Sequence, residues 1–273
     1  MGTLYIVPTP IGNLEDITLR ALRVLREASL IAAEDTRTTR KLLARYDIGT
    51  PLTSYHEHNK LSKLEVIFDA LAQGDVALVS DAGTPGISDP GFELIQEALA
   101  RDVTVVPLPG PSAVIAALVG SGLPTDRFLF AGFLPRRASA LRGALIELAP
   151  LRATLIAYES PSRLVATLDA ARDALGDRPA VVARELSKLH EELRRGTLGA
   201  LADHFRHNPP RGEITLVISG ATEPPADEIW DEARVRRALA ERLAQGEPRS
   251  AAARAVAGAS GWNRRDVYNV DLD

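Results

Sequence analysis

Short apolar runs that alternate with helical patterns constrain the fold of this chain more than any other feature of its sequence. The first four runs lie at residues 4–7, 30–33, 76–79 and 103–106. Runs of this length are typical of strands that are buried on both faces of a parallel sheet. Between them, leucines recur at three-residue intervals, as at Leu19, Leu22 and Leu25, which indicates amphipathic helices. The sequence therefore predicts an α/β fold with a parallel sheet.

Segments rich in proline and glycine divide this pattern. They lie at 107–111 and 120–124, and four more candidate strands follow at 128–131, 154–158, 180–183 and 214–218. After a linker at 222–227 the pattern is purely helical. We therefore expect an N-terminal α/β domain over 1–120, a C-terminal α/β domain over 121–222 and a small helical extension over 227–273.

The composition excludes several classes of protein. With 273 residues, 45% of them apolar, the chain can bury a substantial core. It contains no cysteine, which excludes disulfides, a thiolate nucleophile and cysteine-ligated metals. A net charge of −4 argues against non-specific coating of nucleic acid but allows a local basic patch. We find no pattern of a secretory signal and no apolar run long enough to cross a bilayer, so we expect a cytoplasmic protein without membrane contact.

Three loops that follow predicted strands are candidates for ligand binding. Their candidate residues are Pro10, Gly12, Asp81, Gly83, Thr84, Ser112 and Ala113. Ligands of open α/β sheets bind beyond the carboxyl ends of the strands, so these loops could hold a compact, nucleotide-like ligand through backbone groups. None of them is a P-loop or a G-x-G-x-x-G fingerprint. The structural alternatives are a tight turn at Gly12 and helix capping by Ser112 or Asp89.

Polar clusters follow other predicted strands, at 34–37, 158–163 and 184–188. They too would lie at the sheet edge where substrates dock, although a solvated loop or a structural ion pair is at least as good an interpretation for each. His56 and His58 flank Glu57, but no zincin spacing accompanies them. We therefore expect no metal site.

The predicted helical extension is basic in a chain that is acidic overall. Between Arg249 and Val267, four arginines stand against one acidic residue, Asp266. Helical segments at 250–257 and 263–270, joined by a turn at 258–261, give a helix-turn-helix-like outline. A basic helix with an aromatic residue suits contact with phosphates and bases, although Ala-rich helices also simply pack closely.

Several uncommon motifs occur together and in one order along the chain. They are the segments 5–14 (YIVPTPIGNL), 33–37 (AEDTR), 54–59 (SYHEHN), 80–91 (SDAGTPGISDPG) and 158–161 (YESP). With them the chain, from Thr3 to about Ser219, resembles the bacterial ribose 2′-O-methyltransferases of small-subunit ribosomal RNA, a branch of the tetrapyrrole (corrin/porphyrin) methylase superfamily. The tail at 248–268 resembles the helical extension of this branch. Porphyrin members typically have a Gly-rich first loop and a Gly-Asp-Pro third loop, so the loops of this chain favour the RNA branch.

The resemblance implies two α/β domains of the tetrapyrrole methylase type, a homodimer, and S-adenosylmethionine bound in a folded conformation in the cleft between the domains. It implies methyl transfer to the 2′-hydroxyl of a cytidine in the decoding region of 16S ribosomal RNA, in the small ribosomal subunit. A tetrapyrrole or another small metabolite is the alternative substrate. The cofactor cleft would contain the three first-domain loops and, from the second domain, Tyr158, Glu159, Ile214 and Thr215. The candidate RNA-binding residues are Arg249, Arg254, Arg264, Arg265 and Tyr268.

The chemistry indicates which further groups such an enzyme needs. A sulfonium makes methyl transfer favourable, so the protein must mainly align the hydroxyl for in-line attack. A ribose hydroxyl is a weak nucleophile, and some group should accept its proton. Because they follow strand ends, we expect Glu185 or Asp35 as the base and Lys188 or Arg37 as positioners of a phosphate or of the hydroxyl. A helix-turn-helix regulator with an α/β sensor domain is the non-enzymatic alternative.

Overall fold

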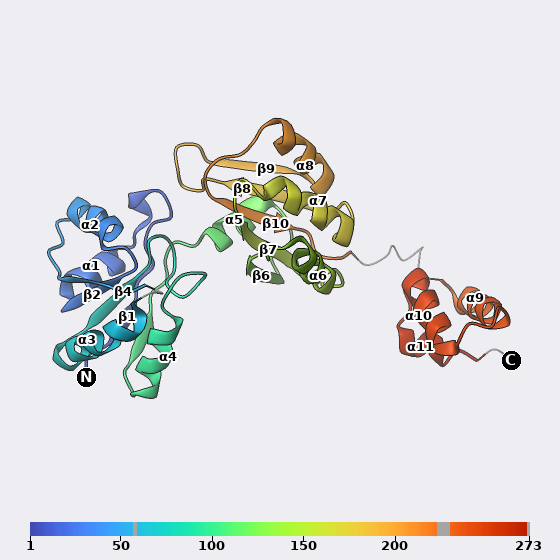
Figure 1. The fold of residues 1–273 in the computed structure, drawn as a ribbon, viewed down its shortest axis with the longest axis horizontal. Coiled ribbons are helices and arrows are strands. Elements are labelled where there is room, and N and C mark those ends of the chain that lie inside the picture. Colours follow the sequence, from blue (N-terminus) through green and yellow to red (C-terminus); the bar gives the residue numbers. More distant parts are fainter. Residues whose placement is uncertain (57–58, 223–229, 272–273) are drawn as a thin grey trace. The chain divides into compact units, whose positions relative to one another are not determined.

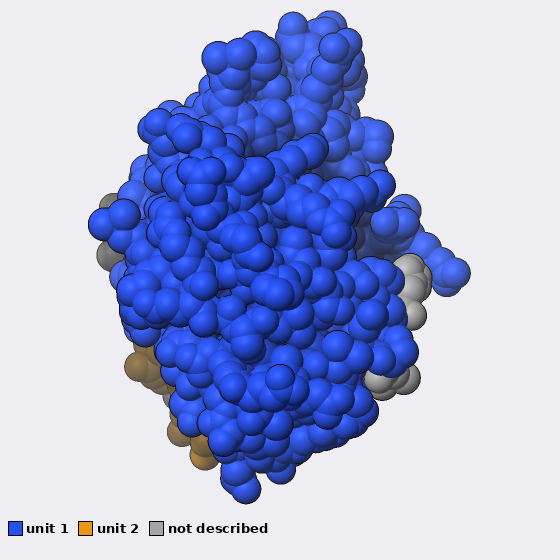
Figure 2. All heavy atoms as spheres, turned by 90° about the vertical axis from the view of Figure 1, so that its left-hand side faces the viewer, with its two compact units in different colours: residues 1–220 blue, residues 221–273 orange. Residues whose placement is uncertain are grey.

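The structure is a computed structural model that describes residues 1–56, 59–222 and 230–271. The chain divides into two compact units, residues 1–220 and 221–273, which are coloured blue and orange in Figure 2. Unit 1 contains two five-stranded sheets, and unit 2 is helical in its described part. The predicted α/β fold is confirmed, with two sheets and their helices in unit 1, whereas the predicted domain boundaries stay a prediction.

The first sheet is parallel throughout, with the strand order β3-β2-β4-β1-β5. Its strands are β1 (Leu4–Ile6), β2 (Leu30–Ala33), β3 (Leu52–Ser54), β4 (Val76–Val79) and β5 (Val105–Pro107). Its helices are η1 (Leu14–Asp16), α1 (Leu19–Glu27), α2 (Thr36–Arg45), α3 (Lys60–Gln73) and α4 (Phe92–Ala100). The helices α1 and α2 pack on one face and α3 and α4 on the other, which buries β4 completely (Figure 1).

The second sheet is mixed, with the order β6-β7-β10-β8-β9. Its strands are β6 (Phe128–Phe133), β7 (Thr154–Glu159), β8 (Pro179–Arg184), β9 (Glu192–Thr197) and β10 (Ile214–Ile218). Only β6 and β7 are parallel among these neighbours, and the last strand, β10, is antiparallel to both β7 and β8. The strands β3 and β9 are absent from the sequence-based prediction because neither contains a continuous apolar run.

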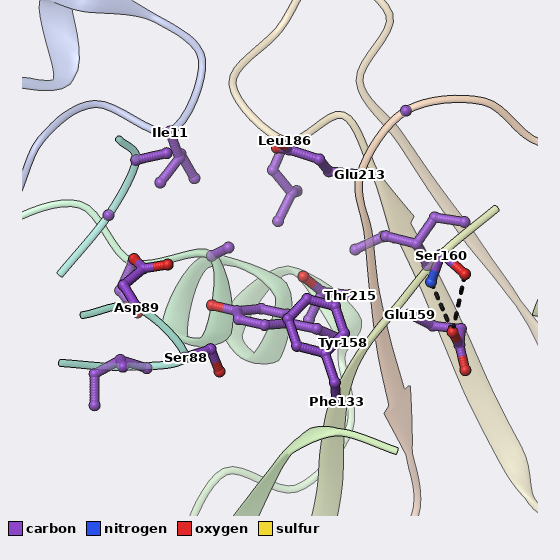
Figure 3. A pocket seen from close by; sticks show the side chains of 18 of the residues that line it. Ile11, Ser88, Asp89, Phe133, Tyr158, Glu159, Ser160, Leu186, Glu213 and Thr215 are labelled. Atoms are coloured by element: carbon purple, nitrogen blue, oxygen red, sulfur yellow. Dashed lines mark hydrogen bonds between the residues drawn. The ribbon is translucent and has the colours of Figure 1, made fainter. Parts of the chain in front are cut away.

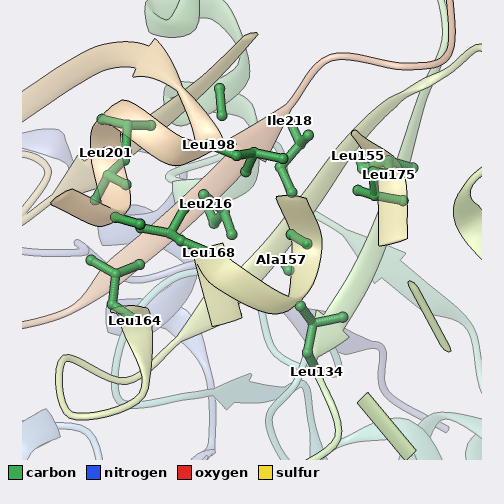
Figure 4. Packing of buried hydrophobic residues seen from close by; sticks show 14 of the residues in the cluster. Leu134, Leu155, Ala157, Leu164, Leu168, Leu175, Leu198, Leu201, Leu216 and Ile218 are labelled. Atoms are coloured by element: carbon green, nitrogen blue, oxygen red, sulfur yellow. The ribbon is translucent and has the colours of Figure 1, made fainter. Parts of the chain in front are cut away.

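Side chains along β10 point alternately to the two faces of the second sheet, so the hydrophobic core around this sheet has two layers. Ile214, Leu216 and Ile218 face a leucine-rich cluster with α6 (Ala138–Leu148), α7 (Leu164–Leu175) and α8 (Leu198–His207), which Figure 4 shows. Val217 faces the opposite layer, where α5 (Ala113–Ser121) packs. By packing, α5 therefore belongs with the second sheet, although the division predicted at residue 120 assigned it to the first domain.

Unit 2 has its own small core. It consists of α9 (Glu232–Ala244), α10 (Arg249–Ser260) and α11 (Arg264–Tyr268), with Val235, Leu239 and Val267 buried among them. Residues 223–229, which include most of the predicted linker and the first residues of the predicted extension, lie outside the described residues. In the described part of the chain, no helix combines the length and the apolar character that a membrane crossing requires.

Candidate active site

Loops from both sheets of unit 1 line a cavity of about 370 Å³. The first sheet contributes Ile11 and the segments 82–84 and 87–89, and the turn before α5 contributes Ser112. The second sheet contributes Phe133, the segment 158–161 and the segment 212–215. Figure 3 shows side chains of these segments facing one another across the cavity.

Hydrogen bonds join the first-sheet loops to one another. Thr9 and Gly83 exchange both backbone N–H···O bonds, each 2.9 Å long. The hydroxyl of Thr84 donates to the carbonyl of Pro111 at 3.3 Å. Gly83 has a φ of +78°, a left-handed conformation that favours glycine. The three loops therefore form one rigid wall at the carboxyl edge of the sheet.

The predicted cofactor residues of these loops fall into two groups. Gly83, Thr84, Ser112 and Ala113 line the cavity, whereas Pro10, Gly12 and Asp81 lie in the same loops outside its lining. Ser112 occupies the N-cap position of α5, but its side chain makes no capping hydrogen bond. The first turn of a helix has amide groups without intrahelical partners, so this end of α5 offers donors at the cavity wall.

The second sheet brings three strand ends to the opposite wall. Because β10 is antiparallel to its neighbours, its first residues lie beside the last residues of β7 and β8, and Thr215 pairs with both Tyr158 and Ala183. Thr215 and Tyr158 line the cavity. In Figure 3 the Tyr158 side chain extends across the cavity toward the loop of Ser88 and Asp89. Burial raises the pKa of the Tyr158 hydroxyl, and the carboxylate of Asp89 adds to the rise.

Glu159 is 3% exposed, and its carboxylate is fully engaged within the protein. One oxygen accepts from the backbone N–H of Ser160 at 2.7 Å, and the other accepts from the Thr167 hydroxyl at 2.6 Å. The guanidinium of Arg163 lies 3.4 Å from the second oxygen and also donates to the carbonyl of Pro135 at 2.8 Å. The contacts of the Glu159 side chain therefore fix the turn after β7, and the neighbouring Ile214 lines the cavity at the paired end of β10.

Asp89 is the aspartate in the cavity lining. Burial raises the pKa of its carboxyl to about 6, against a lowering effect of a hydrogen bond from Ser80. Neighbouring carboxylates add to the rise, and they belong to Glu34, Asp81 and Glu213. Asp89 does not cap the next helix, because the N-cap of α4 is Gly91. A carboxylate with this pKa is both ionised at neutral pH and a better proton acceptor than an ordinary aspartate.

The predicted catalytic pair Glu185 and Lys188 lies just outside the cavity lining. The ammonium of Lys188 donates to Glu185 Oε1 at 2.9 Å and to Glu213 Oε2 at 3.0 Å. Glu185 Oε1 also accepts from the backbone N–H of Glu213 at 2.9 Å, so Lys188 and this N–H lower the pKa of Glu185. The stem of Lys188 contacts Gly12, where any side chain would overlap it. This pair therefore links two second-sheet loops to the first loop of the first sheet.

In the other predicted pair, Arg37 is exposed and Asp35 is half-buried, and the two side chains bond to each other. Arg37 Nη2 lies 2.7 Å from Asp35 Oδ2, and the backbone N–H of Arg37 donates to Asp35 Oδ1 at 2.8 Å. These bonds lower the pKa of Asp35 to about 2. Asp35 also forms the N-cap of α2, and its own N–H donates to Asp81 Oδ1 at 3.1 Å. A carboxylate with so low a pKa is a weak proton acceptor at neutral pH.

In unit 2 the predicted RNA-binding residues differ in how they are engaged. Arg249 donates to the carbonyl oxygens of Tyr268 and Val270, at 3.0 and 2.7 Å, and its guanidinium lies over the Tyr268 ring. Arg254, Arg264 and Arg265 are exposed, and no ion pair joins them to another described residue. The contacts of Arg249 therefore hold α10 to the end of the chain's last helix.

Several residues of the cavity lining carry no functional prediction from the sequence. The sequence predicts only a capping role for Asp89 and no role for Phe133, Leu186 or Gly212, although all four line the cavity. The run of special residues at 80–91 was the signal that contained Asp89. Of the motif at 56–58, only His56 lies within the described residues.

Residues 3–202 match the family of tetrapyrrole (corrin/porphyrin) methylases. The chain belongs to this family. The ribosomal RNA small subunit methyltransferase I of Halalkalibacterium halodurans is 47% identical over 98% of this chain and 94% of its own length. The protein of the same name from Mesorhizobium japonicum is 50% identical over 99% of this chain and 91% of its own length.

Solved structures have the same fold at low identity. A cobalt precorrin-4 methyltransferase superposes with a TM-score of 0.62 at 19% identity and covers 80% of this chain and 94% of its own. A uroporphyrin-III C-methyltransferase from Thermus thermophilus, complexed with S-adenosylhomocysteine, superposes with a TM-score of 0.55 at 22% identity. It covers 80% of this chain and 97% of its own.

The enzyme is a methyltransferase, and its cofactor is S-adenosylmethionine. The cavity fits this molecule in size, since pockets for ligands of this class measure about 300–1,000 Å³. Its walls combine apolar side chains such as Ile11, Leu186 and Ile214 with loop backbone and the hydroxyl of Thr84. Apolar walls suit an adenine ring, and the amide groups in the first turn of α5 suit a carboxylate.

Proposed function

We propose that this chain is an S-adenosylmethionine-dependent methyltransferase that acts on small-subunit ribosomal RNA. The similarity to two proteins named ribosomal RNA small subunit methyltransferase I, at 47% and 50% identity over nearly the whole chain, carries this proposal. From the motif resemblance we further propose the 2′-hydroxyl of a cytidine in the decoding region of 16S ribosomal RNA as the methylated atom. The small ribosomal subunit is then the partner.

The cofactor, when bound, supplies the electrophilic methyl group. The chain must then exclude water, align the hydroxyl and receive its proton. The wall formed by the Thr9–Gly83 and Thr84–Pro111 bonds holds the cofactor side of the cavity in one geometry. Among the carboxylates discussed, that of Asp89 combines a place in the cavity with a raised pKa. We therefore propose the Asp89 carboxylate as the acceptor of the hydroxyl proton.

Glu185 and Asp35 are the alternative bases, with Lys188 and Arg37 as positioners. Single replacement of each of the four by Ala, followed by single-turnover methylation at saturating cofactor, tests these roles. Replacement of the true base lowers the rate by about 10²–10⁴-fold, the usual contribution of general base catalysis. An unchanged rate removes that residue from the candidates. Asp89→Asn belongs in the same series.

The central experiment uses purified protein, labelled S-adenosylmethionine and small ribosomal subunits that lack the modification. Nucleotide mapping should locate one methylated ribose, on a cytidine of the decoding region. Label on a base or on another nucleotide would refute the proposed position but retain an RNA methyltransferase. Absence of label on RNA, with transfer to a tetrapyrrole, would favour the alternative substrate class.

We propose that unit 2 strengthens binding to RNA through Arg254, Arg264 and Arg265. Their replacement by Ala should weaken binding to the small subunit and reduce its salt dependence, because fewer counterions are released. Arg237→Ala is a matched control, since this arginine is also exposed but lies on α9. We assign Arg249 and Tyr268 a supporting role because they contact each other. Equal affinity for the triple variant and the control would contradict the proposal.

From the resemblance we also propose that the enzyme is a homodimer. Light scattering on the purified protein over a range of concentrations tests this proposal. A mass of one chain, 29.3 kDa, at all concentrations would contradict it.

A further inference from the structure

A β-bulge at the end of β6 sets the position of an aromatic side chain at the cavity. Phe128, Leu129 and Phe130 pair in register with β7, but the next paired residue is Phe133, which lies opposite Tyr158. The register shift adds one residue to β6 at this point, and Gly132 takes a left-handed φ of +64°. The bulge therefore places the Phe133 side chain beside Tyr158 at the cavity.

Phe133 packs against the ring of Tyr158, yet it remains open to solvent. Its ring centroid lies 5.4 Å from that of Tyr158, with an angle of 58° between the planes. Tyr158 in turn packs edge-on against Phe130, with centroids 4.9 Å apart. Nevertheless Phe133 is 61% exposed while it lines the cavity. A large aromatic residue held in place from one side and exposed on the other is a stacking surface.

Three arginines follow this surface directly. Arg136 and Arg137 precede α6, and Arg142 lies in its second turn. All three are exposed, and the segment 133–146 contains no acidic residue. No salt bridge joins any of the three to another described residue, in contrast to Arg163, whose guanidinium is bonded to Glu159. The segment therefore presents positive charge that is not neutralised within the described part of the fold.

We propose that the segment 133–142 binds the RNA substrate beside the cavity. Phe133 stacks on an unstacked base at or next to the target nucleotide, and Arg136, Arg137 and Arg142 bind the flanking phosphates. This inference rests on the proposed function. An aromatic face with adjacent arginines is the combination that binds single-stranded nucleic acid, whereas a stacked duplex offers no free base to the ring. The substrate is accordingly a loop or a single-stranded segment.

The test separates RNA binding from cofactor binding. Affinity for unmodified small subunits is measured by filter binding, and cofactor affinity by equilibrium dialysis with labelled S-adenosylmethionine. Phe133→Ala should weaken subunit binding by about 5- to 150-fold, which corresponds to the stacking of one base. Phe133→Trp should bind like the wild type, because it keeps an aromatic face. Phe128→Ala is the matched control, since Phe128 is 44% exposed on the same strand but does not line the cavity.

The arginines are tested through salt dependence. Replacement of Arg136 and Arg137 by Ala should reduce the slope of log affinity against log salt by about 1.4 to 1.8, the contribution of two phosphates. Equal subunit affinity for Phe133→Ala and Phe128→Ala, or an unchanged slope for the arginine variant, would overturn the inference. Loss of cofactor affinity alone would assign Phe133 to the cofactor site instead. Failure of the proposed function would be recognised separately, in the methylation assay. That assay uses only the wild-type enzyme, and it would then show no methyl transfer to ribosomal RNA.

Discussion

Replacement of Asp89 by Asn should stabilise unit 1 at neutral pH. The pKa of Asp89 is raised from 3.8 to about 6 in the folded protein, so the fold favours the protonated form. The native state then binds more protons than the unfolded state between these two values, and stability falls as the pH rises through this window. Above about pH 6 Asp89 is ionised in the folded protein, and the full free-energy cost of burying its carboxylate is present. A neutral Asn removes this cost. Below pH 3.8 both side chains are uncharged and the difference disappears.

The magnitude follows from the pKa difference. A shift of this size corresponds to about 3 kcal/mol for a fully buried group. Asp89 is only half-buried, so water screens part of the interaction, and we expect about 1 to 2 kcal/mol. For a protein of this size the midpoint of thermal unfolding should rise by about 3 to 6 °C.

Urea unfolding followed by far-UV circular dichroism at pH 8 and pH 4.5 measures the effect. Both tryptophans, Trp230 and Trp262, lie in unit 2, so tryptophan fluorescence reports on that unit and should not change. Asp69→Asn, at an exposed position of α3, is the control. An Asp89→Asn variant that is no more stable than wild type at pH 8, or equally stabilised at both pH values, would refute the reasoning.

Three further predictions concern the same cavity. If Asp89 accepts the proton, the single-turnover rate should rise about tenfold per pH unit up to pH 6 and then level off; an unchanged profile in Asp89→Asn would exclude this role. Gly212→Ala should destabilise unit 1 by more than 2 kcal/mol, roughly, because Gly212 has a φ of +82° and a Cβ atom would overlap Glu185. Gly143→Ala, at an open helical position, should be neutral or slightly stabilising, and urea midpoints compare the two. Glu159→Gln should cost about 3 kcal/mol in urea unfolding, because it leaves a cationic partner without its counter-charge; a neutral result would show that the turn after β7 does not depend on this ion pair.

The sequence predicted the strands that contain an apolar run, including the edge strands β5 and β6, which are only partly buried. It did not predict β3 and β9, which lack such a run, nor that β10 is antiparallel to β7 and β8. Whether a strand runs parallel or antiparallel to its neighbours depends on how the connecting segments cross the sheet, and the sequence of one strand does not encode it.

For the candidate site, too, the sequence predicted some of the residues and not others. Gly83, Thr84 and Tyr158 could be selected from motifs and line the cavity. Asp89 and Phe133 could not, because their significance arises from tertiary contacts. The pKa of Asp89 depends on carboxylates from other segments, and the exposure of Phe133 depends on a bulge. The roles of the sequence-selected residues stay predictions that the proposed variants test.

The position of β10 also has a consequence for biosynthesis. The first sheet can close as soon as β5 leaves the ribosome, because its strands are all complete by residue 107. The second sheet cannot, since β10 separates β7 from β8 and is the last strand made. Until residues 214–218 emerge, the chain holds two strand pairs with open inner edges, which are templates for wrong pairing. In a nascent chain that is stalled before Ile214, the first sheet can therefore be complete, whereas the second sheet is incomplete and exposes strand edges to which chaperones can bind.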